Sequence, residues 1–439
     1  MFLRPDPVAS DPQLPTRSSV VIIGGGISGA STALALTEKG VDTVLCEKGE
    51  IGAEQSGRNW GWCRIQGRDP REIPLAIEAM RMWPKLNATV EGETGFRQDG
   101  VVYLCENDRE VARYESWLEH AKLYQLDARL LSRAEVAEML PGATRQWPAG
   151  LYSPSSGRAE PLKAAPAIAT AARRRGAKIL TGCAVRGIET EAGRVSGVVT
   201  ELGRIRCDSV VLAGGAWSRL FCGNIGIDFP QLKVRASVMR TSPITGVPEV
   251  AAGGAGFAFR KRLDGGYTVA NRGASTAEIV PDSFRLFFKF LPALKAQWSE
   301  LRLRLGTRFA EELKLPRRWS LDSVTPFERI RILDPQPDDK LLDQAHATLV
   351  RTFPAFAKTR IVDRWAGFVD VTPDAVPVIG SVQAIPGFFL ASGFSGHGFG
   401  IGPAVGRLLA DLVTGDPPIV DPKPFRFKRF IDGSPIVIH

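Results

Sequence analysis

The chain of 439 residues contains no apolar run close to twenty residues, so we expect no transmembrane helix. Histidine is scarce, and its four copies lack the spacing of a metal site. The six cysteines form no C-x-x-C pair, which favours buried free thiols over metal ligands or disulfides. These shortages argue against a membrane-spanning protein, a zinc protein and a disulfide scaffold.

No block of like charge occurs, although the net charge is +9. The longest basic run, residues 173–175, closes a predicted helix, where cations complement the helix dipole. Nucleic-acid binding is therefore not expected, whereas a basic surface suits an anionic substrate. Residues 1–19 lack the apolar segment of a secretory signal, so a cytoplasmic location is predicted. The length suggests two or three structural units.

Residues 20–47 carry the strongest positive signal. A β-branched run leads into G-x-G-x-x-G, then an amphipathic stretch closed by Gly40, a second apolar run, and the acid Glu47. This order predicts a dinucleotide-binding βαβ unit, with the phosphates at the helix N-terminus and the carboxylate on ribose hydroxyls. The alternative is an ordinary glycine-rich turn. At this point NAD and FAD fit equally well.

Two later stretches repeat the pattern of glycines beside a strand or a helix. Residues 209–217 read as a buried strand running into glycines, and residues 395–400, S-G-H-G-F-G, precede a helix predicted over 403–413. Residues 282–314 are predicted to be helical. There, an apolar stripe at Phe284, Phe287, Phe288 and Leu291 is interpreted as a core face in preference to a membrane-surface face.

Three motifs together resemble a known family. The first G-x-G-x-x-G with Glu47, the strand-to-glycine segment 209–217, and the T-P-D…P-V-I-G…S-G-H-G-F block over 372–399 occur in this order in the D-amino acid oxidase superfamily. That superfamily includes glycine oxidase, sarcosine oxidase and D-amino acid dehydrogenase. The resemblance spans nearly the whole chain and identifies the superfamily without identifying one substrate.

The resemblance implies an α/β fold with an α+β cap: a doubly wound, Rossmann-like FAD domain into which an antiparallel-sheet substrate domain is inserted. Residues 1–85, 151–225 and 355–439 would form the FAD domain. Residues 86–150 and 226–354 would form the cap, with the strand-rich stretch 232–275 facing the isoalloxazine ring.

The resemblance also implies a set of cofactor contacts in the glycine turn, the loop after the second strand, the strand-to-glycine segment and the C-terminal block. These are Gly24, Gly26, Ile27, Ser28, Gly29, Glu47, Lys48, Gln55, Ser56, Arg58, Asn59, Val185, Ala213, Gly214, Gly215, Trp217, Gly367, Gly393, Ser395, Gly396, His397, Gly398, Phe399 and Gly400. Gly367 stands where covalent sarcosine oxidases carry their flavin-linking cysteine, so FAD is expected to bind without a covalent tether.

Two carboxylate anchors of the superfamily are missing. Val369 stands at the position of the substrate-binding arginine, and Gly400 at that of a lysine. Either another cation holds the substrate carboxylate, or the substrate has a different head group. The candidates are Arg64, Arg260 and Arg272, the alternative for each being an ordinary structural arginine. His397 is predicted either to act in catalysis or to shape its loop.

The function expected is oxidation of the C–N bond of an amine or amino acid, with hydride transfer to flavin N5 and hydrolysis of the resulting imine. Oxidation of a 2-hydroxy acid, or a role as the flavin-binding subunit of a larger dehydrogenase, are the alternatives. Electrons would pass to O2 or to a carrier. The predicted partners are thus small molecules, with peripheral membrane contact as a further option and the oligomeric state open.

Overall fold

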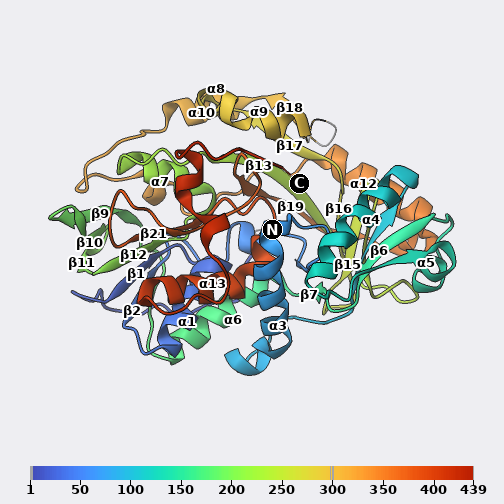
Figure 1. Cartoon of the computed structure of the whole chain (residues 1–439), viewed down its shortest axis with the longest axis horizontal. Coiled ribbons are helices and arrows are strands. Elements are labelled where there is room, and N and C mark those ends of the chain that lie inside the picture. Colours follow the sequence, from blue (N-terminus) through green and yellow to red (C-terminus); the bar gives the residue numbers. More distant parts are fainter. Residues whose placement is uncertain (1–2, 297, 299–300, 439) are drawn as a thin grey trace.

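Our computed structural model describes residues 3–296, 298 and 301–438. One region is built on a six-stranded sheet, seen at the left of Figure 1, in the order β20-β21-β12-β1-β2-β8. Its strands are β1 (Val20–Ile23), β2 (Thr43–Cys46), β8 (Lys178–Leu180), β12 (Ser209–Leu212), β20 (Val378–Ser381) and β21 (Phe388–Ser392). All pair in parallel except β20. Their apolar, β-branched sequences suit strands that are buried on both faces.

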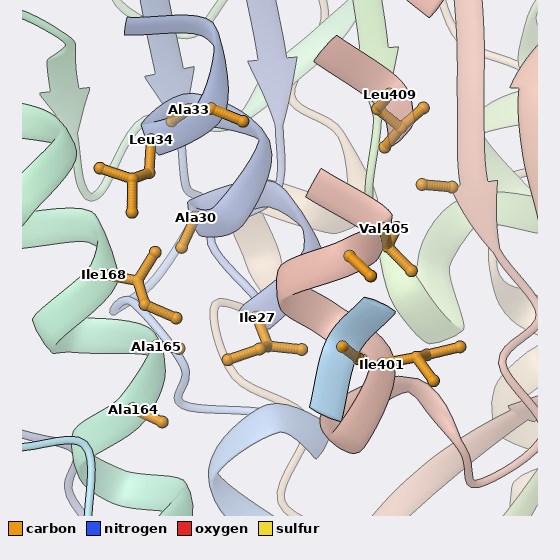
Figure 2. Close-up of a cluster of buried hydrophobic side chains, with 14 of the residues drawn as sticks. Ile27, Ala30, Ala33, Leu34, Ala164, Ala165, Ile168, Ile401, Val405 and Leu409 are labelled. Atoms are coloured by element: carbon orange, nitrogen blue, oxygen red, sulfur yellow. The ribbon is translucent and has the colours of Figure 1, made fainter. Parts of the chain in front are cut away.

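Helices cover one face of this sheet. They are α1 (Ile27–Glu38), α3 (Ile73–Val90), α6 (Pro161–Arg174) and α13 (Gly398–Thr414). Figure 2 shows α1 between α6 and α13, with the Ile27, Ala30 and Leu34 side chains in the shared core. The small residues permit this close packing: a Cβ on Gly406 of α13 would lie 2.3 Å from the carbonyl carbon of Ser31. The first βαβ unit is thereby fixed to the C-terminal helix.

A smaller antiparallel sheet covers the opposite face. Its strands are β9 (Val185–Glu191), β10 (Arg194–Thr200) and β11 (Gly203–Arg206), followed along the chain by β12 and α7 (Ser218–Asn224). Val198, Ile205 and Phe221 contribute to the core on this side. The six cysteines of the chain are all buried and all free, as the sequence predicts.

The second region is a ten-stranded, mainly antiparallel sheet in the order β18-β17-β13-β16-β15-β14-β4-β6-β5, with β19 paired to β13. Its strands are β4 (Val101–Cys105), β5 (Arg129–Ser132), β6 (Ala149–Ser153), β13 (Leu232–Thr241), β14 (Ala251–Gly254), β15 (Phe257–Lys261), β16 (Tyr267–Ala270), β17 (Ser275–Ile279), β18 (Leu301–Leu305) and β19 (Ile361–Val371). Leu342, Ala345 and Leu349 of α12 (Asp339–Thr352) pack against its core. The other helices of this region include α4 (Asp108–Leu123) and α5 (Arg133–Met139).

The two regions exchange segments at three places. Strand β6 begins before residue 151 and pairs with β4, and β19 pairs with β13, so both belong to the large sheet. Conversely, Phe327 of α11 (Pro326–Arg329) packs in the core of the region built on the six-stranded sheet. The inserted antiparallel domain therefore has boundaries that differ locally from the predicted ones.

Residues 281–314 are not one helical stretch. They form α8 (Pro281–Arg285), α9 (Phe287–Ala296), β18 and α10 (Thr307–Lys314), and Figure 1 shows them along the upper edge of the molecule. Strand β18 pairs in parallel with β17, which breaks the helical pattern. Within the described ranges, no helix is long and apolar enough to cross a membrane.

Candidate cofactor and substrate site

A cavity of about 1350 Å³, counting space open to solvent, begins at the carboxyl ends of β1, β2 and β12 and reaches β19. Ligands of doubly wound sheets bind at this edge, where helix N-termini and loops converge. The described residues that line it come from the glycine turn, the end of β2, the strand-to-glycine segment and the S-G-H-G-F loop, which are far apart in the chain.

The glycine turn after β1 closes one wall through backbone contacts. Gly24 has φ +107°, and a Cβ there would lie 2.5 Å from the carbonyl oxygen of Ala213. A Cβ on Gly29 would lie 1.9 Å from the carbonyl oxygen of Gly24. Only glycine fits at either position, so the backbone N–H groups of the α1 N-terminus remain open to a phosphate. Ser56 contributes here as well, since its Oγ accepts the Ile27 N–H at 2.9 Å.

Glu47 lines the cavity at the end of β2. Its Oε2 accepts the Gly25 N–H and its Oε1 the Gly49 N–H, both at 2.7 Å. Burial raises the pKa of this carboxyl above its ordinary value, an effect that Lys48 and the two backbone donors oppose. A carboxylate has lone pairs beyond these two bonds, so Glu47 is placed to accept bonds from ribose hydroxyls.

The short helix α2 (Gln55–Arg58) carries two buried polar atoms that have no hydrogen-bond partner among the described residues, Gln55 Oε1 and Arg58 Nη2. The rest of the Arg58 guanidinium is bonded to the carbonyls of Ala53 and Ala366, each at 2.9 Å, and to Asp334. Both residues line the cavity. Buried polar atoms are rarely left unbonded, so these two indicate a polar ligand at this position.

The loop before α13 presents Gly396, Gly398 and Phe399 to the cavity. The His397 ring points away from the cavity, with Nδ1 2.8 Å from Oε2 of the buried Glu72, and it is absent from the cavity lining. Burial lowers the pKa of His397, against the effect of Glu72. Burial would raise the pKa of Glu72, but His397 and Arg68 outweigh it and hold that pKa below its ordinary value. A neutral His397 therefore donates Nδ1–H to an ionised Glu72, and this bond shapes the loop.

Arg64 and Arg272 meet over the ring of Tyr103, although they come from different parts of the chain. Their guanidinium carbons lie 5.2 Å and 4.3 Å from the ring centroid. Arg64 donates to the carbonyl of Gln66, and Arg272 to the carbonyl of Gly253 and the hydroxyl of Tyr114. In the described part of the chain, neither guanidinium bonds to a carboxylate. Glu72 lies near enough to Arg64, and Glu110 near enough to Arg272, to interact electrostatically, but the donors of the pair stay available to a ligand carboxylate.

The third predicted arginine is bonded differently. Arg260 is buried and makes a bidentate ion pair with Glu160, at 2.9 and 3.1 Å, and its Nε donates to the carbonyl of Trp60. These bonds occupy its donors and tie β15 to the loop before β3 (Trp62–Cys63). Its position is that of a structural link between the two regions rather than a substrate anchor.

Most of the predicted cofactor contacts line the cavity. The exceptions are Gly29, Gly367, Gly393, Ser395, His397 and Gly400, which lie just behind its wall. A Cβ on Gly367 would lie 2.2 Å from Gln55 Oε1, and one on Gly400 would lie 3.2 Å from the carbonyl oxygen of Trp62. Packing therefore constrains Gly367 severely and Gly400 moderately.

Several lining residues were not predicted from the sequence. Phe327, Arg331 and Leu333 reach the cavity from a segment that the sequence places in the cap. Phe368 lines it from β19, and Tyr103 organises the arginine pair from β4. No local motif marks these positions, because each depends on where its strand or loop lies in the folded chain.

The model of the DAO family, described as "FAD dependent oxidoreductase", matches residues 19–412. The structure is similar to L-amino acid deaminase from Proteus myxofaciens in complex with anthranilate, with 38% identity, a TM-score of 0.94 and coverage of 97% of each chain. It is also similar to L-amino acid deaminase from Proteus vulgaris, with 33% identity, a TM-score of 0.93 and coverage of 97% and 100%. These matches confirm the predicted fold class, and the family match confirms the predicted FAD cofactor.

Curated relatives include mouse mitochondrial dimethylglycine dehydrogenase, 24% identical over 96% of this chain and 46% of the relative. Glycine oxidase of Pseudomonas putida is 26% identical over 92% of this chain and 97% of the relative. The chain thus spans less than half the length of the first of these relatives. The unpartnered atoms of Gln55 and Arg58, the open helix N-terminus and Glu47 all fit FAD.

Proposed function

The chain belongs to the DAO family of FAD-dependent oxidoreductases, and from this premise we propose that it oxidises the C–N bond of an α-amino acid whose carboxylate binds Arg64 and Arg272. The similarity to two L-amino acid deaminases favours the L enantiomer and a net deamination to a 2-oxo acid and ammonia. The observation that carries the proposal is the pair of guanidinium groups on Tyr103, which lack a carboxylate partner in the described chain.

Arg64, Arg272 and Tyr103 do not line the cavity themselves, and we infer that they adjoin the end where the flavin ring is expected. Arg68 follows Arg64 closely and bonds to Glu72, and Glu72 bonds to His397 between two lining glycines. Arg68 is also close enough to α13 that a Cβ on Gly400 would lie 3.3 Å from its Nη2. Burial lowers the pKa of Arg68 to about 10, so the group stays charged at neutral pH. An amino-acid carboxylate on this cationic cluster would place its α-carbon toward the lining residues Val369 and Phe399.

The residues of the chain then act by position and electrostatics. FAD, when bound, accepts the hydride equivalent from the α-carbon. Arg64 and Arg272 would orient the carboxylate by charge-assisted hydrogen bonds, and Tyr103 would keep both guanidinium planes in place. The lining aromatic rings of Phe368 and Phe399 would exclude water from the reacting carbon. Lack of space beside Gly367 supports attachment of FAD without a covalent bond.

A second candidate shares the same anchor, because the arginine pair would hold the carboxylate of a 2-hydroxy acid equally well. Anaerobic reduction of the bound flavin by matched pairs, an L-amino acid and the hydroxy acid with the same side chain, separates the two. The proposal expects bleaching by the amino acid, with ammonia and the 2-oxo acid as products after reoxidation. Bleaching by the hydroxy acid alone supports the second candidate, and a flavin that neither compound bleaches supports a non-catalytic flavin subunit.

A further inference from the structure

The phenylalanine stripe of residues 284–288 faces solvent. Phe284, Phe287 and Phe288 are 65%, 46% and 85% exposed. The prediction of a core face is therefore wrong for these three rings, whereas Leu291, the fourth residue of the predicted stripe, is partly buried. The core positions are Leu286 and Phe290, which are one helical turn apart and point inward. Three exposed rings within five residues are unusual for the surface of a soluble protein.

The exposed apolar surface continues onto the neighbouring elements. Trp298 is 63% exposed, and Leu303, Leu305 and Leu313 are also exposed. We call the described residues of 281–314 the ridge. Figure 1 shows α8, α9, α10 and β18 of the ridge together along one edge of the molecule. Elsewhere in the described chain, exposed large apolar side chains occur singly, as Leu202 does, or as the adjacent pair Leu123 and Tyr124.

The ridge is attached firmly to the body of the molecule. Asp282 bonds to Arg219 of α7 at 2.9 Å, and Lys289 bonds to Asp228 at 3.1 Å. Strand β18 pairs with β17 over five residues. The rings are therefore held facing outward by helices and a strand that ion pairs and strand pairing attach to the rest of the molecule.

The ridge carries a net positive charge. Residues 281–314 contain seven lysines and arginines against four aspartates and glutamates. Two of the acids, Asp282 and Glu312, are bonded to the body through Arg219 and Lys233. The cations Lys295, Arg302 and Lys314 are exposed. A surface with aromatic rings beside exposed cations matches the boundary of an anionic bilayer, where rings enter the interface and cations meet the headgroups.

We propose that the ridge docks this protein on the surface of an anionic lipid bilayer. A second copy of the chain is the less favoured occupant, because two identical ridges would bring exposed cations together. The proposal concerns location and is independent of the reaction, since vesicle binding needs no substrate.

The test is co-sedimentation of the FAD-loaded protein with phosphatidylcholine vesicles that contain or lack phosphatidylglycerol. Binding is expected to the anionic vesicles and to weaken as salt is added. The combined variant Phe284→Ser, Phe287→Ser, Phe288→Ser is expected to lower the partition coefficient by at least ~10-fold. The variant Lys295→Glu, Arg302→Glu should bind the anionic vesicles less tightly than the wild type. Any weak binding to vesicles of phosphatidylcholine alone should be unchanged.

The matched control is Leu123→Ser with Leu202→Ser, which removes exposed apolar side chains away from the ridge and should leave vesicle binding unchanged. FAD content of every variant reports its folding. The proposal is overturned if the wild type stays in the supernatant, or if the serine variant binds as well as the wild type. It is also overturned if sedimentation velocity reveals a dimer that the serine variant dissociates while vesicles remain unbound.

Discussion

The two ends of the site are built in different ways. At the dinucleotide end, main-chain segments pack directly against one another: the Gly24 and Gly29 Cα atoms lie against carbonyl oxygens, with no room for a side chain. At the amine end, long side chains from separate strands and loops converge, with Arg64 and Arg272 on the ring of Tyr103. The closely packed main chain suits one ligand, the dinucleotide. The side chains at the amine end can instead be substituted one at a time without moving the main chain.

This contrast predicts how each end responds to substitution. A side chain added at the backbone-built end must displace main chain, so cofactor binding and folding fail together. A side chain removed at the other end takes away one charged contact and leaves the fold in place. The predictions that follow run from the largest expected effect to the smallest.

Substituting Gly29→Val is expected to abolish FAD binding. The new Cβ would lie 1.9 Å from the carbonyl oxygen of Gly24, so α1 would have to move away from β1. Flavin absorbance per purified chain should fall at least ~10-fold, or the protein should become insoluble. Gly223→Ala in α7 is the control, because no atom lies within 4 Å of its added Cβ, and it should retain FAD. A Gly29→Val protein with full FAD would show that the two ends do not differ as described.

Substituting Arg272→Gln should raise the KM for an L-amino acid by roughly 10- to 100-fold, the range expected for loss of a charge-assisted bond. FAD content should stay within error, because Arg272 contacts neighbours in the large sheet and none of the dinucleotide-end residues. Steady-state kinetics and flavin absorbance measure the two effects. Arg109→Gln, at an exposed arginine, is the control. If FAD is lost while kinetics per flavin are unchanged, the arginine belongs to the cofactor end.

The His397–Glu72 hydrogen bond lies between the two ends of the site. Because both groups titrate, the stability of the folded protein depends on pH. Burial lowers the pKa of His397 below 6.5, so the unfolded chain binds a proton at a higher pH than the folded one. Its contribution to stability is complete above pH 6.5 and is lost as pH falls through the folded pKa. The pKa of Glu72 is also lowered, so its contribution is lost further down, below pH 4.5.

The thermal midpoint of the FAD-loaded protein should therefore fall as pH is lowered from 7 toward 5.5, by roughly 2–4 °C. His397→Asn should flatten this dependence, and differential scanning calorimetry at several pH values measures it. A midpoint that rises over the same interval would contradict the assignment of a neutral, buried imidazole.

The sequence predicts the two ends unequally, for a physical reason. The glycine turn and Glu47 are local: their order along 28 residues reproduces their order in space. Arg64 and Arg272 are candidates by residue type and by their places after the predicted cofactor loop and on a predicted cap strand. The sequence offers the same argument for Arg260, which is paired with Glu160. Tyr103 and Arg331 carry no signal, because strand pairing and loop packing bring them to the site. The phenylalanine stripe was misassigned because periodicity shows that a face is apolar without showing what covers it.

The most direct test of the central claim compares an L-amino acid with the amine that differs only by loss of the carboxylate. Anaerobic stopped-flow reduction of the bound flavin gives the apparent Kd and limiting rate for each compound. Our account predicts that the wild type binds the amino acid at least ~10-fold more tightly than the amine. It also predicts that this preference largely disappears in the Arg64→Gln, Arg272→Gln double variant. Equal binding of the two compounds by the wild type, or an undiminished preference in the double variant, would contradict it.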